Sequence, residues 1–419
     1  MAVVIDLNDV ALGLWQDSTP TFSPGYAHFS GTGYQYGAPA RATSRRTPRE
    51  VNTRYWSQLS TESLTPALGP ARHSADLAHG HLQTLLNNAG QPDNALLLVP
   101  GHWSREQLSL LLGLTDALNL AADALVHRSA AAGATAGCDR GTHVELQLHQ
   151  TLITPWHQEG GMAYALQAQQ LPGMGLLALQ DKLATAIARL FVQQSRFDPL
   201  RSADAEQALY NGMAEALTEL QSQTETQLNI NGYQARVTRE DLQPIGREFR
   251  ERLQGLQGPG PLIIEYPLNL LPGLDHDGSV IALDRSAMVA LLQRQWQTLK
   301  QPREQLALTR AVAANDTTDS QPTSVTDTAA QSHTEEHPKS APAPTHLLIG
   351  NQASPIGRLG SAVFSAWSVS QQQGQWWVEQ APTDGRVNER TVTAGAPLQV
   401  GDTLIDSNGT QALLIYVED

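Results

Sequence analysis

Cysteine, charged residues and aromatic residues are all scarce in this chain of 419 residues. The single cysteine, Cys138, excludes an internal disulfide framework and the cysteine-rich zinc modules, and it fits a reducing compartment. Charged residues make up 16% of the chain, below the usual quarter. The most apolar window, residues 108–126, carries Asp116, Asn119 and Asp123, so it is too polar for a membrane span. We expect this window to form a helix pair and the protein not to insert into membranes.

Basic residues are outnumbered by acidic ones, with 27 Lys+Arg against 41 Asp+Glu and a formal net charge of −14. This balance disfavours attraction to phosphate backbones and to anionic lipids. The N-terminal run MAVVIDL lacks the basic region of a signal peptide. The sequence therefore predicts a cytoplasmic protein with protein partners, and it disfavours nucleic acid as a ligand.

One segment runs against the overall charge. Five arginines fall between residues 41 and 54 and follow an aromatic stretch that holds Tyr26, Phe29, Tyr34 and Tyr36. Basic residues beside aromatic residues can bind single-stranded nucleic acid by stacking and phosphate contact. The interpretation favoured by the net charge is a surface insertion that docks on acidic residues of the protein itself or of a partner. The five arginines are Arg41, Arg45, Arg46, Arg49 and Arg54.

The chain divides into three parts by composition. Residues 313–345 hold almost no large apolar side chains, several acidic residues and four prolines, so they cannot bury enough surface to offset the entropy cost of ordering. We predict a flexible acidic linker there, between a large domain at 1–312 and a small β domain at 346–419. The sequence shows no internal repeat.

The large domain alternates β-prone and helical segments. Apolar runs at 3–7 and 96–99 predict strands, and Ser104 followed by Gln107 has the spacing of a capping box. Residues 144–154 alternate apolar and polar side chains and predict one strand. Residues 176–194 and 203–229 are predicted as long helices, and a further helix is predicted to be capped near Asp284. Such alternation is typical of layered α/β folds.

The order of these segments matches a known family. The run VVIDL opens the chain, and residues 95–134 supply a strand, the dipeptide VP, a helix and a pair of alanines. The runs VELQLHQTLIT at 144–154 and PLIIEYPLNLLPGL at 261–274 follow. In order and spacing, roughly residues 1–300 resemble the actin-like ATPases, most closely the DnaK (heat-shock chaperone)-related branch.

The resemblance implies a two-lobed actin-like (ribonuclease H-like) domain that holds Mg-ATP between its lobes. In a working ATPase of this kind, Asp6 would position metal-bound water and Glu145 would be a second carboxylate of the metal shell. The positions that would face a bound nucleotide are Asp6, Asn8, Asp9, Glu145, Gln147 and Gly273.

The glycines of the family's phosphate loops are missing from this chain. Backbone N–H groups approach phosphates closely only where no Cβ intervenes, which is why these loops use glycine. The family's IDLGTT becomes IDLNDV at 5–10, and its DLGGGT becomes ELQLHQ at 145–150. The adenosine-loop GG becomes Glu265-Tyr266, although Gly273 retains a later glycine. We therefore predict that side chains make the nucleotide pocket acidic, that the cleft between the lobes is empty or plugged by side chains, and that ATP is not hydrolysed above background.

The C-terminal part reads as a small all-β sandwich, because short β-prone runs are separated by Gly, Asn and Asp turns. The run PIGR at 355–358 and the segment from residue 385 onward resemble a forkhead-associated domain. The resemblance implies that Arg358 contacts phosphothreonine. Alternation along the strand predicts that one of Trp376 and Trp377 is buried and the other exposed.

Two groups of residues are of types that could bind a metal ion: His73, His79 and His81, and, on one predicted strand face, His143, Glu145 and His149. Residues 79 and 81 point apart on a helix. Residues 143 and 149 would be about 20 Å apart along a strand. We therefore interpret them as structural or exposed residues and predict no metal. No nucleophile elbow, P-loop or dinucleotide loop occurs.

These observations predict an α/β, two-lobed actin-like domain, a linker and a small β domain. The favoured function is a non-catalytic scaffold or assembly protein, a pseudo-ATPase without a cofactor. One alternative is a divergent DnaK-like chaperone that binds Mg-ATP, with the residues named above as its site. Another is a phosphopeptide-reading adaptor that uses Arg358. The sequence leaves the oligomeric state open.

Overall fold

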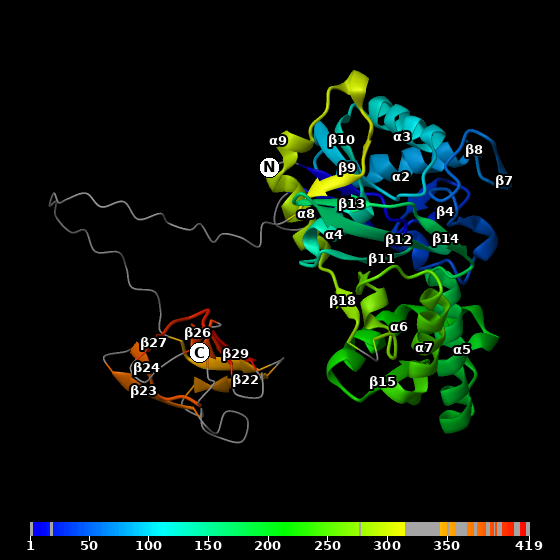
Figure 1. Ribbon diagram of the computed structural model, residues 1–419. Coiled ribbons are helices and arrows are strands. Elements are labelled where there is room, and N and C mark those ends of the chain that lie inside the picture. Colours follow the sequence, from blue (N-terminus) through cyan, green and yellow to red (C-terminus); the bar gives the residue numbers. More distant parts are fainter. Residues whose placement is uncertain are drawn as a thin grey trace. The chain divides into compact units, whose positions relative to one another are not determined.

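The protein folds into two compact units, Met1–Pro322 and Thr323–Asp419. The structure is a computed structural model (Figure 1). It describes residues 3–16, 20–275 and 278–314 of the first unit. Of the second it describes 344–349, 352–356, 367–372, 375–382, 386–388, 390–391, 396–405 and 411–415. The predicted mixed α/β class is confirmed. Most of the predicted linker, residues 315–343, and Arg358 lie outside the described residues.

The first sheet of the large unit has the strand order β19-β10-β9-β1-β2-β3. Strands β1, β2 and β3 are antiparallel neighbours, whereas β9, β10 and β19 continue from β1 in parallel. The strands are β1 (Val4–Asp6), β2 (Leu12–Trp15), β3 (Thr21–Ser23), β9 (Asn94–Val99), β10 (Ala121–His127) and β19 (Leu308–Thr309).

The second sheet repeats this arrangement. Its order is β18-β17-β11-β12-β13-β20, with β14 also paired to β12. Strands β11, β12 and β13 are antiparallel, and β17 and β18 continue from β11 in parallel. One topology thus occurs twice although the sequence shows no repeat. The strands are β11 (Arg140–Leu146), β12 (Gln150–Glu159), β13 (Met162–Ala165), β14 (Gln169–Pro172), β17 (Leu262–Ile264), β18 (Val280–Ala282) and β20 (Ala311–Ala313).

Helices and small hairpins surround the two sheets. The described helices are α1 (Ala38–Arg41), α2 (Ser74–Asn88), α3 (Arg105–Ala117), α4 (Arg128–Thr135), α5 (Leu176–Ser195), α6 (Ala203–Ser222), α7 (Arg239–Gln254), α8 (Arg285–Arg294) and α9 (Trp296–Leu299). The small hairpins are β4 (Ala27–Phe29) with β5 (Tyr34–Tyr36) and β6 (Val51–Asn52), β7 (Ser63–Leu68) with β8 (Ala71–His73), and β15 (Glu225–Ile230) with β16 (Tyr233–Thr238). The predicted capping box is confirmed, because Ser104 Oγ accepts from the Gln107 N–H and Gln107 Oε1 accepts from the Ser104 N–H.

Three predicted segments differ from the structure. Residues 144–154 form a hairpin rather than one strand, because the chain turns at 147–149 and the Gln147 N–H donates to the Gln150 carbonyl. The predicted helix at 203–229 ends at Ser222, and β15 follows. The predicted helix pair at 108–126 is a helix followed by a buried strand, and Asn119, at φ 57°, makes the left-handed turn between them.

Alternate residues of the first sheet enter two different cores, as the period of a strand requires. Ile5, Leu97 and Leu125 pack with α2 and α3 on one face. On the other face, Val4, Leu96 and Val126 pack with α4 and α8. Trp156 and Ile263 of the second sheet join this same core, so α4 and α8 lie between the two sheets.

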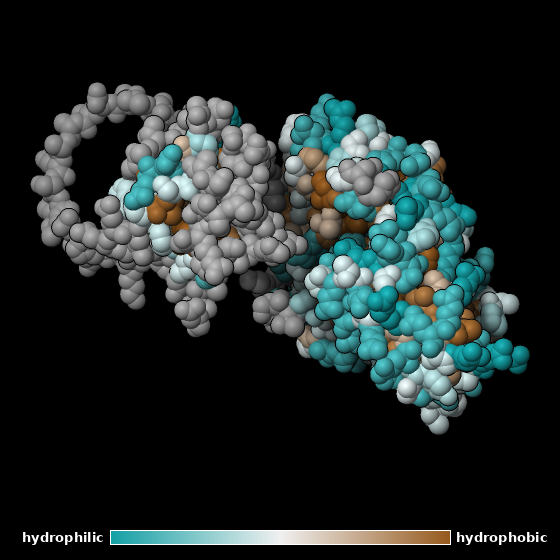
Figure 2. Space-filling model, turned by 90° about the horizontal axis from the view of Figure 1, so that it is seen from below, coloured by the Kyte–Doolittle hydropathy of each residue, from teal (hydrophilic) through white to brown (hydrophobic). Residues whose placement is uncertain are grey.

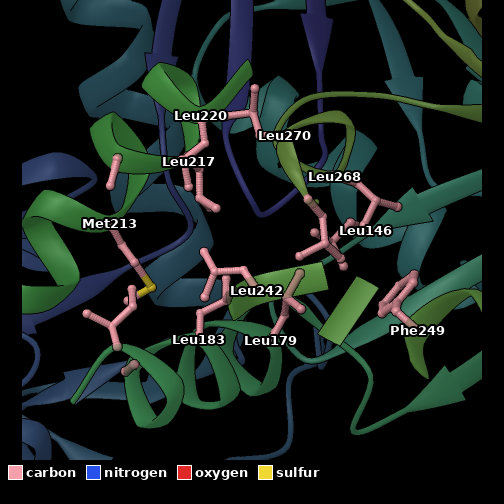
Figure 3. Packing of buried hydrophobic residues seen from close by; sticks show 14 of the residues in the cluster. Leu146, Leu179, Leu183, Met213, Leu217, Leu220, Leu242, Phe249, Leu268 and Leu270 are labelled. Carbon is pink, nitrogen blue, oxygen red and sulfur yellow. The ribbon is translucent and has the colours of Figure 1, made fainter. Parts of the chain in front are cut away.

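The small residues of α4 follow from that position. A Cβ added to Gly133 would come within 2.5 Å of the Trp156 ring. The run of alanines around it is completely buried. The opposite face of the second sheet packs against α5, α6 and α7 and forms the largest apolar cluster, part of which is shown in Figure 3.

The C-terminal unit is all-β in its described residues. Its two sheets have the orders β22-β21-β29-β28-β25-β26 and β23-β24-β27. The strands are β21 (His346–Ile349), β22 (Gln352–Pro355), β23 (Ser368–Gln372), β24 (Gln375–Gln380), β25 (Arg386–Val387), β26 (Arg390–Thr391), β27 (Pro397–Leu398), β28 (Thr403–Ile405) and β29 (Gln411–Ile415).

The prediction for the two tryptophans of β24 was wrong. Both Trp376 and Trp377 are half-buried, and the fully buried tryptophan is Trp367, which packs with Val378 and Leu404. In its described residues the sheet that holds β24 has three short strands, so neither of its faces is broad enough to cover a tryptophan side chain completely.

The surface of the first unit that faces the viewer in Figure 2 is mostly hydrophilic, with separate hydrophobic patches. None of the helices in the described part of the chain is long and apolar enough to cross a membrane.

Candidate functional site

The site lies where strands of both sheets end. Asp6 is the last residue of β1, and Glu145 is the last but one of β11. Glu265 directly follows β17. The chain leaves β10 at His127 and enters α4 at Arg128, a start that is capped because His127 Nδ1 accepts from the Ser129 N–H at 3.1 Å. Sheet topology therefore brings together carboxylates that are far apart in sequence.

Arg128 lies at the centre of these carboxylates and is completely buried. Its Nε lies 2.6 Å from Asp6 Oδ1, and its Nη2 lies 3.0 Å from Asp6 Oδ2. The same Nη2 lies 2.8 Å from Glu265 Oε2, and Nη1 lies 3.3 Å from Glu145 Oε2. One guanidinium thus contacts three acidic side chains at once.

Arg285, the first residue of α8, supplies a second guanidinium. Its Nη2 lies 2.5 Å from Asp6 Oδ2 and donates to the Ala11 carbonyl at 3.0 Å. Burial alone would raise the pKa of Asp6, but the charges of Arg128 and Arg285 outweigh it and hold the pKa below its ordinary value. Asp6 is therefore ionised and fully engaged.

Glu265, which contacts Arg128 through Oε2, has a second partner at its other carboxylate oxygen, Oε1. His143 Nε2 lies 2.7 Å from Glu265 Oε1, while His143 Nδ1 lies 2.9 Å from Ser129 Oγ. Burial would raise the pKa of Glu265, but Arg128 and the hydrogen bond from His143 lower it well below its usual range. His143 is thus a member of this buried network.

The two turns predicted to face a nucleotide contact each other directly. Asn8 Nδ2 donates to the Leu146 carbonyl at 3.0 Å, and the Leu148 N–H donates to Asp9 Oδ1 at 2.8 Å. Gln147 Nε2 donates to Glu145 Oε1 at 3.0 Å. Backbone and side-chain groups of the protein therefore satisfy one another between the turns.

Asp9 differs from the other carboxylates because none of the described arginines forms an ion pair with it. Burial raises its pKa to about 7, even though the Leu148 N–H favours the ionised form. Its second oxygen, Oδ2, is buried without a hydrogen-bond partner. Asp9 therefore titrates near neutral pH inside the contact between the two turns.

The arrangement is an ion network rather than an open metal site. Asp6 and Glu145 are almost fully buried and both contact Arg128, so a cation would have to displace a guanidinium to reach them. In the portion that the structure describes, no group of three or more His, Cys, Asp or Glu side chains could hold a metal ion.

The structure brings together five of the six predicted site residues: Asp6, Asn8, Asp9, Glu145 and Gln147. Two guanidinium groups, those of Arg128 and Arg285, lie among these carboxylates, and the prediction of an acidic cleft did not include them. Gly273 does not join them. It contacts α7, where a Cβ would lie 2.5 Å from the Gln243 carbonyl oxygen.

Replacing Gly273 with alanine is expected to lower the free energy of unfolding by about 1–3 kcal/mol. Gly273 has a φ of 82°, which L side chains rarely adopt, and the added Cβ would also clash with backbone. Chemical denaturation measures the loss. Gly255→Ala is the matched control, because a Cβ there meets nothing within 4 Å. Equal effects of the two changes would contradict a structural role for Gly273.

Sequence reasoning missed Arg128 and Arg285 and did not connect His143 with Glu265. A signal for Arg128 was present, because it is one charged residue between an apolar strand and an alanine-rich helix. A charge in such a setting is expected to be paired. Its partner Asp6 lies 122 positions away, so sequence alone does not identify the pair.

The basic segment docks on the protein itself. Arg45 pairs with Asp181 of α5 and Glu206 of α6, and its guanidinium lies 3.6 Å from the centre of the Tyr210 ring. Arg46 pairs with Asp204 at 2.7 Å. The interpretation of this segment as a surface insertion docked on acidic residues is confirmed for these two arginines.

Two other histidines that were candidates for a metal site, His81 and His149, have structural partners. His81 is fully buried and receives hydrogen bonds from Tyr55 and Trp56. Burial lowers the pKa of His81 to about 3. His149 lies in the turn after β11 and contacts Thr53, so the prediction that it shares a strand face with His143 was wrong.

Comparison of the sequence with protein-family models finds no match. Comparison with curated proteins finds none either. The function is therefore inferred from the geometry of the site itself.

Proposed function

We propose that the protein is a non-catalytic, actin-like scaffold or assembly protein of the DnaK-related type, which acts through protein contacts and does not hydrolyse ATP. The repeated topology supports the fold assignment. Each sheet is a three-stranded antiparallel meander continued by parallel strands, and a ribonuclease H-like domain duplicated in tandem requires two such sheets. Helices α5, α6 and α7 form an insertion between β14 and β17 of the second sheet.

The observation that carries the proposal is the position of Arg128. In the actin-like interpretation, Asp6 and Glu145 are the residues that would handle a metal ion and its water. Here their oxygens are occupied by a buried guanidinium that forms part of the chain. Displacing it would leave an unpaired buried charge, which costs several kcal/mol.

The contact between the turns supports the same conclusion. Phosphate binding uses backbone N–H groups that point at the ligand. The Leu148 N–H instead donates to Asp9, and the Asn8 side-chain amide donates to the Leu146 carbonyl. A nucleotide would have to break both hydrogen bonds and place its phosphates beside Asp9.

Apolar side chains at the surface support a role in protein contacts. Val192 near the end of α5, Leu200 and Tyr233 are each more than a third exposed. Tyr233 stacks on Phe197 at a centroid distance of 4.3 Å. Exposed apolar side chains that gather at one end of a domain are typical of interaction surfaces.

Titration of the full chain with Mg-ATP tests the proposal. Calorimetry is expected to show no saturable heat, and phosphate release is expected to stay at background. Asp6→Asn is the matched control, because it removes the carboxylate on which an ATPase would depend. If the wild type and Asp6→Asn release phosphate at the same rate, that release comes from a contaminating ATPase. Saturable micromolar binding, with release that Asp6→Asn abolishes, would contradict the proposal and favour a Mg-ATP-dependent chaperone.

A further inference from the structure

We propose that the cavity between α5, α6 and the ends of β17 and β18 binds a small amphipathic anion, with an apolar body and one negatively charged group. This inference goes beyond the proposed function and does not depend on it. The cavity has a volume of about 680 Å³, within the range of small-molecule sites.

The walls of the cavity are mainly aliphatic. Leu179 and Leu183 of α5 face Met213 and Leu217 of α6 across it, and Leu270 closes a further side. Figure 3 shows these five side chains around a common space. Such walls favour a ligand body that gains free energy by leaving water.

The end of the cavity at α8 offers no uncommitted positive charge. Arg285 reaches it, but its guanidinium is committed to Asp6 and to the Ala11 carbonyl. Asp284 also lines the cavity, and its Oδ1 accepts the Ser286 N–H at 2.8 Å as the cap of α8. Arg285 cannot bind an anion without giving up an existing partner, and the carboxylate of Asp284 repels one, so the anionic group of a ligand is disfavoured at this end.

The rim offers one uncommitted positive charge. Arg41 lines the cavity at the end of α1 and is exposed, and no described acidic group forms an ion pair with it. Its neighbours Arg45 and Arg46 are already paired with α5 and α6. Charge complementarity therefore calls for a single anionic group at the mouth. A polyanion would find one cation only.

The probe 8-anilinonaphthalene-1-sulfonate has an apolar aromatic body and one anionic group, and its fluorescence rises when it leaves water. Titration of the full chain is expected to show one saturable site, and dodecanoate is expected to displace the probe. Arg41→Ala should weaken binding about three- to fivefold, the effect of losing an exposed ion pair. Arg49→Ala, which removes an exposed arginine that does not line the cavity, should leave binding unchanged.

A second pair of variants tests the location without disturbing the core. Ala214 lines the cavity and is exposed on α6, so Ala214→Trp should fill the mouth and abolish binding. Glu215→Trp places the same ring on an exposed position that does not line the cavity and should bind normally. Melting temperatures within a few degrees of wild type establish that each variant is folded.

Three results would overturn the proposal. The first is probe binding that is equal in wild type, Arg41→Ala and Ala214→Trp. The second is binding of several probe molecules without saturation. The third is displacement by dodecyltrimethylammonium as effective as that by dodecanoate, because it would remove the role of the positive rim.

Discussion

Replacing Arg128 with methionine is expected to lower the free energy of unfolding by about 3–5 kcal/mol. Methionine keeps much of the side-chain length but removes the charge. Asp6, Glu145 and Glu265 would then remain buried together, with Arg285 as the one guanidinium beside them. Removing one partner from a buried ion network leaves desolvated charge without compensation, which is why the expected loss is large.

Urea denaturation at pH 7 measures this loss. Arg46→Met is the control, because its ion pair with Asp204 lies at the surface, and it should cost about 1 kcal/mol or less. A loss below about 1 kcal/mol for Arg128→Met would show that the network is not held by this guanidinium.

The pH dependence of the variant should have the opposite sign from that of the wild-type network. In the wild type the pKa values of Asp6 and Glu265 lie below their ordinary values. Their stabilisation is therefore present above about pH 4 and is lost as the pH falls further. In Arg128→Met, burial without the guanidinium raises these pKa values, so lowering the pH from 7 to 5 should restore part of the lost stability.

Replacing Asp9 with asparagine is expected to stabilise the protein at pH 8, by about 2 kcal/mol or more, and to have little effect below about pH 4. The pKa of Asp9 is raised to about 7 in the folded protein, against about 3.8 when unfolded. The folded state therefore holds the proton more tightly, and stability is lost as the pH rises from about 4 through 7. Asparagine has no charge to bury, and its Oδ1 can still accept the Leu148 N–H.

Unfolding curves at a series of pH values check this prediction. The difference between wild type and Asp9→Asn should grow from about pH 4 to pH 8 and then level off. Asp139→Asn, at an exposed loop position, should give a curve parallel to that of the wild type. A constant difference across the whole range would show that Asp9 does not titrate near neutral pH.

Local sequence signals predicted the local structure well. The apolar runs at β1 and β9, the capping box of α3 and the carboxylate positions Asp6 and Glu145 were all identified from short windows. The hairpin at 147–149 was not, because Gln147, Leu148 and His149 continue the strand pattern and none is a typical turn residue. Tertiary contacts to Asn8 and Asp9 hold that turn.

The ion pairs and hydrogen bonds of the site join residues that lie too far apart in the sequence for one short window to contain both. Arg285 and Asp6 are 279 positions apart, and His143 and Glu265 are 122 apart. The apolar residues of α5 and α6 predicted helices, but not that the packed helices would leave a cavity beside β17. The pairing of these carboxylates with two guanidinium groups becomes visible only when the two sheets are placed together.

The short stretch that holds β19 and β20 has a consequence for synthesis on the ribosome. Leu308–Thr309 adds the last strand to the first sheet, and Ala311–Ala313, two residues later, adds an edge strand to the second. Neither sheet can be completed until translation has passed residue 313 and that stretch has left the exit tunnel. Pairing across such long sequence separations is slow. The nascent first unit therefore carries two incomplete sheet edges for most of its synthesis, and both are completed in a single late step.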